Sequence, residues 1–355
     1  MMAETTMTIL GTSGAGKTCY LLSMYHKICS GMNGFTITTD DDTDVDLRHR
    51  YDQMKDRSLG PRRFPAGTDG RSQYEFTLEC GYKPVMSFSW DDYPGGYLDV
   101  KGTGDMDSYK QIEQSILNSS CLFICIDGTL LQGDDIDEKI SAIQDDCSIY
   151  INPFFSKYMK EHGALPPTAF VITKWDICAP DNSSDDLKKI ISATFSPFFE
   201  AGKKGKTIAA IIPVSIDLYS NSTEPGKRMR PYDIELPIFM GIFFALRNKM
   251  NNYKYKQNEI SNPNQIRTIR KNFFQPRPLL GSLLGGDIIF DLFKQITTAK
   301  EIKVNTAKEI KDKFNINQKS LQKMFLQLEE CIPLFFINGK QGRFSDIVEK
   351  RDAND

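Results

Sequence analysis

The feature that most constrains this chain is a short stretch near its start that fits the pattern G-x-x-x-x-G-K-T at every position: Gly11-Thr12-Ser13-Gly14-Ala15-Gly16-Lys17-Thr18. The apolar run 7–10 before it is β-prone and the stretch 19–24 after it suits a helix, which is the context of a phosphate-binding loop (P-loop). A glycine-rich turn that binds nothing is the alternative, and the flanking strand and helix patterns disfavour it.

A P-loop assigns a role to each of its residues. The glycines allow successive backbone N–H groups to turn toward one anion, beside the positive end of the following helix. We expect Lys17 to reach the β- and γ-phosphates of a nucleotide and the Thr18 hydroxyl to ligate Mg²⁺. The remaining members of the expected phosphate cradle are Gly11, Gly14, Ala15, Gly16 and Cys19.

Composition disfavours several classes of protein but does not indicate a particular function. The chain has 355 residues and a net charge of −2, which gives no global attraction to nucleic acid or to an anionic membrane. The first residues lack the regions of a secretory signal, and no run approaches the ~18 apolar residues of a membrane span. Eight cysteines without a C-x-x-C pair and three scattered histidines show no zinc or disulfide pattern. These features predict a cytoplasmic protein without a membrane span.

The order of apolar runs predicts the fold class. Residues 73–80 and 84–90 read as a β-hairpin, while 121–126, 169–172 and 208–214 read as strands buried on both faces. Before the hairpin, an acidic run at 40–46 is expected to open a helix ending near Arg57. Between the strands 121–126 and 169–172, residues 137–160 read as helix interrupted near Asn152-Pro153. This alternation predicts an α/β domain, a mainly parallel sheet with helices on both faces, over residues 1–257.

Two further motifs follow the P-loop in order. Asp92 ends the hairpin and Gly95 lies three residues later, so the carboxylate can reach Mg²⁺ while the glycine N–H approaches the γ-phosphate. Asp91 would instead pair with Pro94, which has no N–H to offer. The second motif, Thr173-Lys174-Trp175-Asp176, stands at the carboxyl end of a predicted strand.

With these three motifs in order, the chain resembles the P-loop GTPases of the translation-factor and Ras-like class. The resemblance implies that Asp176 reads guanine N1 and N2, that the Lys174 stem packs along the base, and that Thr173 braces the loop. Ser215-Ile216 stands where the family has an S-A-type loop that reads guanine O6, although Ile216 departs from the usual small residue. An adenine lacks the two donors that Asp176 needs, so the resemblance implies GTP/GDP with Mg²⁺.

In the same family, a loop threonine before the hairpin completes the Mg²⁺ shell. Thr68 stands there, 24 residues ahead of Asp92, and Thr43 is the alternative. The separation of about 50 residues between Thr18 and Thr68 implies an enlarged segment over about 32–67. The insertion and the Asp-Tyr-Pro-Gly stretch also resemble bacterial double-GTPase-type proteins, which are predicted to act in conflict systems.

The switch sequence also predicts slow turnover. Many of these GTPases place a glutamine after the switch glycine to orient the attacking water, and this chain has Gly96 there. Slow intrinsic hydrolysis is therefore expected, unless Arg62 or Arg63 contributes from within the chain or a protein partner acts in trans.

The C-terminal part reads differently from the rest. Residues 258–278 are polar and rich in proline and asparagine, as in a linker, and the order of elements over 279–355 looks like a winged helix-turn-helix ending in a hairpin. Such a module would dock a protein or bind DNA, and an oligomer is compatible with the sequence. The sequence thus predicts a GTP-binding molecular switch, with a nucleotide-sensing DNA-binding regulator as the alternative. An ATP-dependent enzyme would require residues 173–176 to match by coincidence.

Overall fold

The computed structural model describes residues 5–66, 70–95, 106–203, 207–218, 228–246, 318–332 and 334–346. Thr68, Gly96, the predicted linker 258–278 and the expected winged-helix elements over 279–317 lie outside these ranges. Within them, none of the helices combines the length and apolar character that a membrane span requires.

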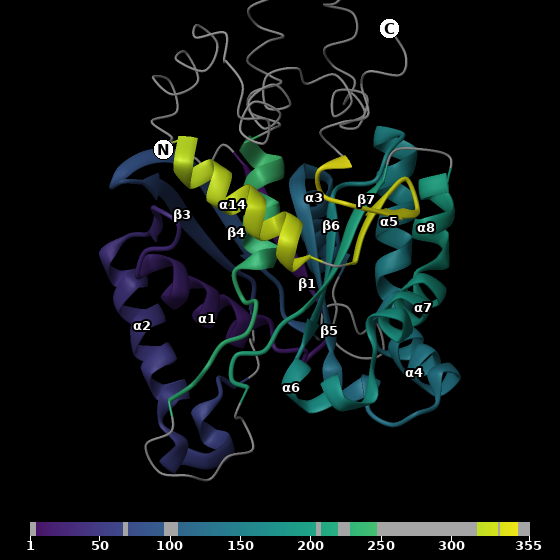
Figure 1. Ribbon diagram of the computed structural model, residues 1–355, viewed down its shortest axis with the longest axis horizontal. Helices are drawn as coiled ribbons and strands as arrows, with labels where there is room; N and C mark the ends of the chain where they lie inside the picture. Colours follow the sequence, from purple (N-terminus) through teal and green to yellow (C-terminus); the bar gives the residue numbers. More distant parts are fainter. Residues whose placement is uncertain are drawn as a thin grey trace, which may run out of the picture.

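A nine-stranded sheet in the order β2-β3-β4-β1-β5-β6-β7-β8-β9 forms the centre of the molecule (Figure 1). Strands β4, β1, β5, β6 and β7 are mutually parallel, while β2 and β3 at one edge and β8 and β9 at the other are antiparallel additions. The strands are β1 (Thr6–Leu10), β2 (Phe35–Thr38), β3 (Ser72–Cys80), β4 (Lys83–Asp92), β5 (Ser119–Asp127), β6 (Thr168–Thr173), β7 (Ile208–Pro213), β8 (Leu334–Ile337) and β9 (Lys340–Gly342). The predicted α/β class with a mainly parallel sheet is confirmed.

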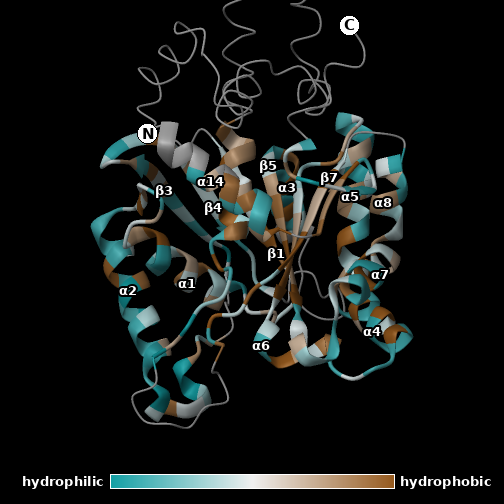
Figure 2. Ribbon diagram, viewed as in Figure 1, coloured by the Kyte–Doolittle hydropathy of each residue, from teal (hydrophilic) through white to brown (hydrophobic). Residues whose placement is uncertain are grey.

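Successive side chains of the central strands point to opposite faces of the sheet, and they form two hydrophobic cores, one on each face. In β5, Phe123 and Cys125 point into one core, whereas Leu122 and Ile124 point into the other. Figure 2 shows the resulting apolar strands between helices whose outer faces are polar. Because both faces are covered, these strands could be recognised in the sequence as continuous apolar runs.

The helices divide between the two faces. The first core is closed by α1 (Lys17–Cys29), α2 (Asp41–Lys55), a helix over 236–246 and α14 (Gln318–Cys331). The second is closed by α3 (Met106–Asn118), α4 (Ile136–Ile143), α5 (Ile149–His162), α7 (Ser184–Thr194) and α8 (Ser196–Lys203). The short helix α6 (Trp175–Cys178) continues directly from the end of β6.

The acidic run at 40–46 opens α2, as expected. Asp40 is the N-cap, and its side chain accepts a hydrogen bond of 3.0 Å from the Thr43 N–H. Further aspartates in the first turn complement the positive end of the helix. Thr43 thus lies in the first helical turn.

The interruption expected near Asn152-Pro153 lies elsewhere. The chain leaves α4 through a π-helical turn, Gln144–Ser148, and Pro153 stands inside the unbroken helix α5. A π-turn inserts an extra residue into the helical register, so it reorients the flanking helices without the signature of a proline.

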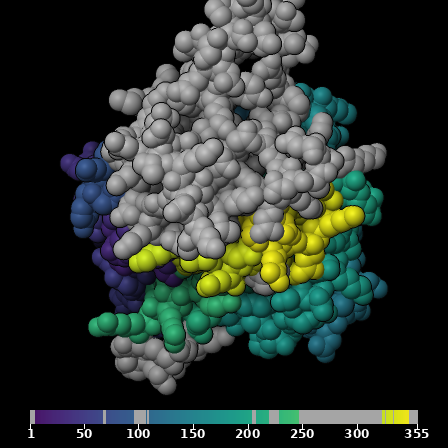
Figure 3. All heavy atoms as spheres, turned by 45° about the horizontal axis from the view of Figure 1, so that its top comes forward, coloured from purple at the N-terminus to yellow at the C-terminus, as the bar shows by residue number. Residues whose placement is uncertain are grey.

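The C-terminal hairpin forms at the expected residues, but it is part of the central sheet. β8 pairs antiparallel with β7, and β9 pairs with β8, so both strands extend the sheet of the nucleotide domain. Helix α14 joins the same core, and its Gln327 side chain donates a 2.7 Å hydrogen bond to Glu235. Figure 3 shows this segment, in yellow, against residues from the middle of the chain. The hairpin is therefore not the wing of a separate module, because its backbone groups and apolar faces complete the central sheet.

Candidate nucleotide-binding site

A cavity of about 580 Å³ opens where the parallel strands end in loops. It is lined by residues from the P-loop, from the segment before Thr68 and from the loops after β6 and β7: Ser13, Gly14, Gly16, Lys17, Thr18, Cys19, Tyr20, Arg63, Phe64, Pro65, Ala66, Gly95, Thr129, Thr173, Lys174, Asp176, Ile177, Val214, Ile216 and Ile234. The structure thus brings together residues that are more than two hundred positions apart in the sequence. Ligands commonly bind at the carboxyl ends of strands in such sheets.

The P-loop backbone has the conformation that its glycines allow. Gly14 and Gly16 have φ of 82° and 79°, a left-handed region that residues with a Cβ rarely adopt. Gly11 has no room for a side chain, since a Cβ there would lie 2.6 Å from the Cys125 carbonyl oxygen. The loop therefore packs against β5 and turns into α1 at Lys17.

Lys17 is buried beneath this loop. Its ammonium group donates hydrogen bonds to the carbonyl oxygens of Gly11, at 2.7 Å, and Thr12, at 3.0 Å. Burial lowers the pKa of Lys17, while Asp92 opposes that shift. The Cys19 side chain lies nearby, and burial raises its pKa to about 11, so it is a thiol at neutral pH.

Asp92 and Thr18 form the corner that suits a metal ion. The Thr18 hydroxyl lies 3.5 Å from Asp92 Oδ2, and Asp92 Oδ1 is buried without a hydrogen bond to any described residue. Burial raises the pKa of Asp92 to about 6, opposed by Lys17 and by the Thr18 hydrogen bond. A buried carboxylate oxygen without a partner beside a hydroxyl fits the oxygen ligands that Mg²⁺ prefers.

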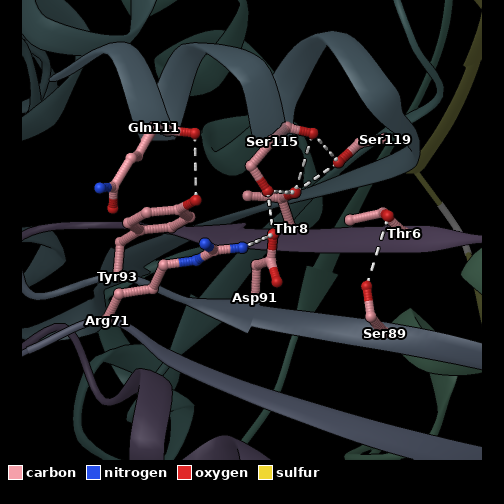
Figure 4. Close-up of polar contacts among 9 residues, drawn as sticks. All are labelled: Thr6, Thr8, Arg71, Ser89, Asp91, Tyr93, Gln111, Ser115 and Ser119. Atoms are coloured by element: carbon pink, nitrogen blue, oxygen red, sulfur yellow. Dashed lines mark hydrogen bonds and ion pairs between the residues drawn. The ribbon is translucent and has the colours of Figure 1, made fainter. Parts of the chain in front are cut away.

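Asp91, the neighbour of Asp92, faces the other side of the sheet. Figure 4 shows its carboxylate between the Ser115 hydroxyl of α3 and the Arg71 guanidinium, the latter 3.1 Å away. The same buried cluster joins Thr8 of β1 to Ser115 at 2.9 Å. Asp91 therefore anchors α3 on the sheet, and Asp92 is the carboxylate directed at the P-loop.

Gly95 lies directly against the P-loop. A Cβ at this position would be 2.0 Å from the Ser13 nitrogen, so only glycine fits the observed approach. The segment after Asp92 is thus in contact with the loop that would hold the phosphates.

At the other end of the cavity, the loops after β6 and β7 meet. The Thr173 hydroxyl lies 3.0 Å from the carbonyl oxygens of both Ala15 and Ile126, which joins the P-loop to β5 and β6. The Ser215 hydroxyl donates a 2.5 Å hydrogen bond to Asp176 Oδ1. Lys174 has φ of 51° and its ammonium group lies 2.5 Å from Asp127 Oδ2.

Of the other residues expected at the site, some line the cavity and others do not. Ile216 lines the cavity and Ser215 is buried beside it. Arg63 is buried and reaches toward Asp217, whereas Arg62 is exposed. Thr43 does not line the cavity, and Thr68 lies outside the described residues.

Sequence reasoning did not identify four residues of the site region. Asp127 pairs with Lys174, Asp146 accepts a hydrogen bond from Thr12, Asp217 pairs with Arg57, and Phe64 lines the cavity. Asp127 ends a buried apolar run, which is a recognisable signal. Asp146 and Asp217 carry no such signal, because aspartates in polar stretches are usually solvated.

Comparisons with known proteins give only weak likenesses. No protein-family model matches the chain, and no curated protein matches its sequence. Among solved structures, it is similar to a nucleolar GTP-binding protein 1 from Plasmodium falciparum, with a TM-score of 0.36 and 10% identity over 74% of this chain and 96% of that one.

Two further solved structures are similar at the same level. The signal recognition particle receptor SRb-GTP/SRX complex from Chaetomium thermophilum gives a TM-score of 0.36 and 12% identity, over 69% of this chain and 99% of that one. The Arl6 BBS3 small GTPase from Trypanosoma brucei gives a TM-score of 0.31 and 15% identity, over 59% of this chain and 86% of that one. Likenesses this weak establish neither family nor activity for this chain, so its function is inferred from the site's own residues.

Proposed function

We propose that this protein is a Mg²⁺-dependent GTP-binding switch that hydrolyses GTP slowly. The observation that carries the proposal is a single cavity with a P-loop at one end and the Asp176 carboxylate, fixed by Ser215, at the other. A nucleoside triphosphate matches this arrangement, because its phosphates lie at one end of the molecule and its base at the other.

Guanine is the base that fits Asp176. Guanine N1–H and the N2 amino group are two adjacent donors, and a carboxylate held in place can accept from both. Adenine offers no such pair, so binding it would leave a desolvated carboxylate without donors, at a cost of roughly 1–3 kcal/mol or more. The hydrogen bond from Ser215 supports this reading because it fixes the carboxylate before a ligand arrives.

The phosphates and the metal ion would lie at the P-loop. Thr18 and Asp92 are the residues that would hold Mg²⁺ with the phosphate oxygens, and we propose Thr68 as a third ligand. No group of three or more His, Cys, Asp or Glu side chains among the described residues is arranged to bind a metal by itself. We therefore expect the ion to arrive with the nucleotide, to whose phosphates it supplies charge neutralisation.

Hydrolysis is expected to be slow because Gly96 has no side chain to orient water. We propose that a protein partner supplies the missing group in trans. Arg63 is engaged near Asp217, which disfavours it as an internal substitute, and Arg62 is the more accessible of the two. Signalling would then proceed through the C-terminal part of the chain, anchored to the sheet by β8 and β9.

The test is nucleotide binding and single-turnover hydrolysis by the full chain, with GTP, GDP and ATP in Mg²⁺ or EDTA. The wild type should prefer guanine nucleotides, require Mg²⁺ for tight GTP binding and turn over slowly. Asp176→Asn should lose that preference, whereas Asp185→Asn, at an exposed position of α7, should retain it. Equal affinity of the wild type for ATP and GTP would overturn the proposal.

A further inference from the structure

The segment before Thr68 is tied to the loop after β7 by buried ion pairs that the nucleotide motifs do not require. Asp217 lies two residues after Ser215, and its side chain is 1% exposed. Arg57 pairs with Asp217 Oδ2, and Arg63 Nη2 lies 4.0 Å from the same oxygen. The Arg230 N–H also donates a 3.2 Å hydrogen bond to Asp217 Oδ1.

These ion pairs continue into the base-recognition corner. The Asp217 N–H donates a 3.1 Å hydrogen bond to the Ser215 hydroxyl oxygen, and that hydroxyl donates to Asp176 Oδ1 at 2.5 Å. Two successive hydrogen bonds therefore connect the carboxylate expected to read guanine with the backbone of Asp217, the residue whose side chain the arginines hold. A displacement of Asp217 would move Ser215 and release Asp176 from its fixed orientation.

The arginines come from the segment that forms one wall of the cavity. Residues Arg57–Arg63 form a 3₁₀ helix, kinked at Gly60, and the chain then passes Phe64, Pro65 and Ala66 along the cavity. The Arg63 guanidinium carbon lies 4.5 Å from the centre of the Phe64 ring, so the ion-paired residue also contacts a wall residue. Thr68 follows two residues after this wall.

We propose that Asp217 is a positioning residue for guanine recognition and that its pairing with Arg57 and Arg63 forms a clamp that controls release of the nucleotide. The clamp holds the wall segment over the base end of the cavity and orients Asp176 through Ser215. A nucleotide can leave only when the wall moves, which separates buried opposite charges. This inference rests on the proposed guanine-binding function and adds to it a link between the segment carrying Thr68 and the base.

The measurement is the release rate of fluorescent GDP from the full chain, for Arg57→Gln, Asp217→Asn and the double variant. Each single variant should release GDP about tenfold faster or more, because it removes the Arg57–Asp217 ion pair from a site largely shielded from water. The double variant should release no faster than the faster single variant, since one interaction is removed in each. Arg48→Gln is the matched control: it removes the same charge at an exposed position of α2, away from Asp217, and should leave the rate unchanged.

A second readout separates positioning from general loosening. Inosine diphosphate lacks the guanine 2-amino group, so the preference for GDP over it reports how well Asp176 is oriented. Asp217→Asn should reduce that preference, whereas a purely structural defect would weaken both ligands equally and overturn the positioning role. Arg57→Lys should restore part of the slow release, since it retains the charge on a less exacting geometry.

The outcomes distinguish the two proposals. A wild type that binds no guanine nucleotide overturns the proposed function itself. A wild type that binds GDP, with folded Arg57→Gln and Asp217→Asn variants releasing it at the wild-type rate, overturns the clamp alone. If Asp217→Asn fails to fold, Arg57→Gln decides, because its side chain is the more exposed member of the pair, at 15%.

Discussion

The Thr12 hydroxyl of the P-loop donates a 2.8 Å hydrogen bond to Asp146 Oδ2. Asp146 stands in the π-helical turn Gln144–Ser148, which brings this part of the chain against the P-loop. Burial raises the pKa of Asp146, while the Thr12 hydrogen bond and two lysines oppose the shift. The π-turn therefore contributes to holding the loop in shape, as such turns often do at functional sites.

Thr12→Val should loosen this contact with little change in volume. The variant leaves a half-buried carboxylate without one of its donors, and we expect a loss of about 1–2 kcal/mol of folding free energy. Mg²⁺-GTP affinity should fall several-fold because the loop is less well ordered beforehand. Urea denaturation and equilibrium binding would measure the two effects. Thr36→Val, which removes a 3.3 Å hydrogen bond to Glu79 at the sheet edge, should leave binding unchanged.

Gly95→Ala should separate GTP-dependent behaviour from simple nucleotide binding. The added Cβ would fall 2.0 Å from the Ser13 nitrogen, so the segment after Asp92 must move away from the P-loop. We expect single-turnover hydrolysis to fall at least tenfold while GDP affinity changes by less than about threefold, because the γ-phosphate is the group Gly95 is expected to approach. Gly70→Ala is the control, since a Cβ there meets nothing within 4 Å. Wild-type hydrolysis in Gly95→Ala would show that this contact plays no part in turnover.

Local patterns in the sequence were sufficient for the P-loop, the central strands and the hairpin β3-β4. Each depends on spacing between near neighbours: the glycines of residues 11–16, the uninterrupted apolar run of β5 and the alternation of β3. These patterns predict that Lys17, Asp92 and Asp176 lie at one edge of the sheet, because the carboxyl ends of parallel strands meet at the same edge.

The features that could not be predicted depend on long-range pairing. The sequence of β8 reads as a hairpin strand, but nothing local says that it will pair with β7 instead of closing a separate wing. The Arg57–Asp217 pair likewise joins residues 160 positions apart, and neither residue type signals a buried partner. The π-turn also takes part in a long-range contact, because its Asp146 accepts a hydrogen bond from Thr12, 134 positions earlier in the chain.

The stability of the fold should depend on pH through His162. This side chain is 7% exposed and packs against the tilted ring of Tyr158, with ring centres 4.2 Å apart. Neither ring nitrogen of His162 has a hydrogen-bond partner among the described residues. Burial lowers its pKa below the usual 6.5, so the folded state favours the neutral ring. The unfolded chain therefore binds the proton more readily than the folded one. The stability that the buried neutral ring contributes is complete above pH 6.5, and it is lost as the pH falls toward the folded-state pKa.

His162→Phe tests that sign, because phenylalanine retains the ring and removes the titration. Between pH 7 and pH 5, the unfolding free energy of the variant should fall less steeply than that of the wild type, by up to about 1.4 kcal/mol per pH unit. Urea denaturation at several pH values would measure it. His49→Gln, at an exposed position of α2, is the matched control and should follow the wild-type slope. Parallel curves for His162→Phe and the wild type would contradict the assignment.

Phe335→Ala should show that the C-terminal hairpin and the nucleotide domain unfold together. Phe335 of β8 is fully buried, lies opposite Ala210 of β7 and packs against Phe344 with ring centres 5.2 Å apart. Removing this ring should cost about 3–5 kcal/mol. Both tryptophans, Trp90 in β4 and Trp175 in α6, lie in the nucleotide domain and report its unfolding by fluorescence. Because β8 completes the same sheet, their transition should shift to lower urea in Phe335→Ala and stay in place in Leu326→Ala, whose side chain is 39% exposed. A tryptophan transition unmoved by Phe335→Ala would mean that the hairpin folds independently, as a separate wing would.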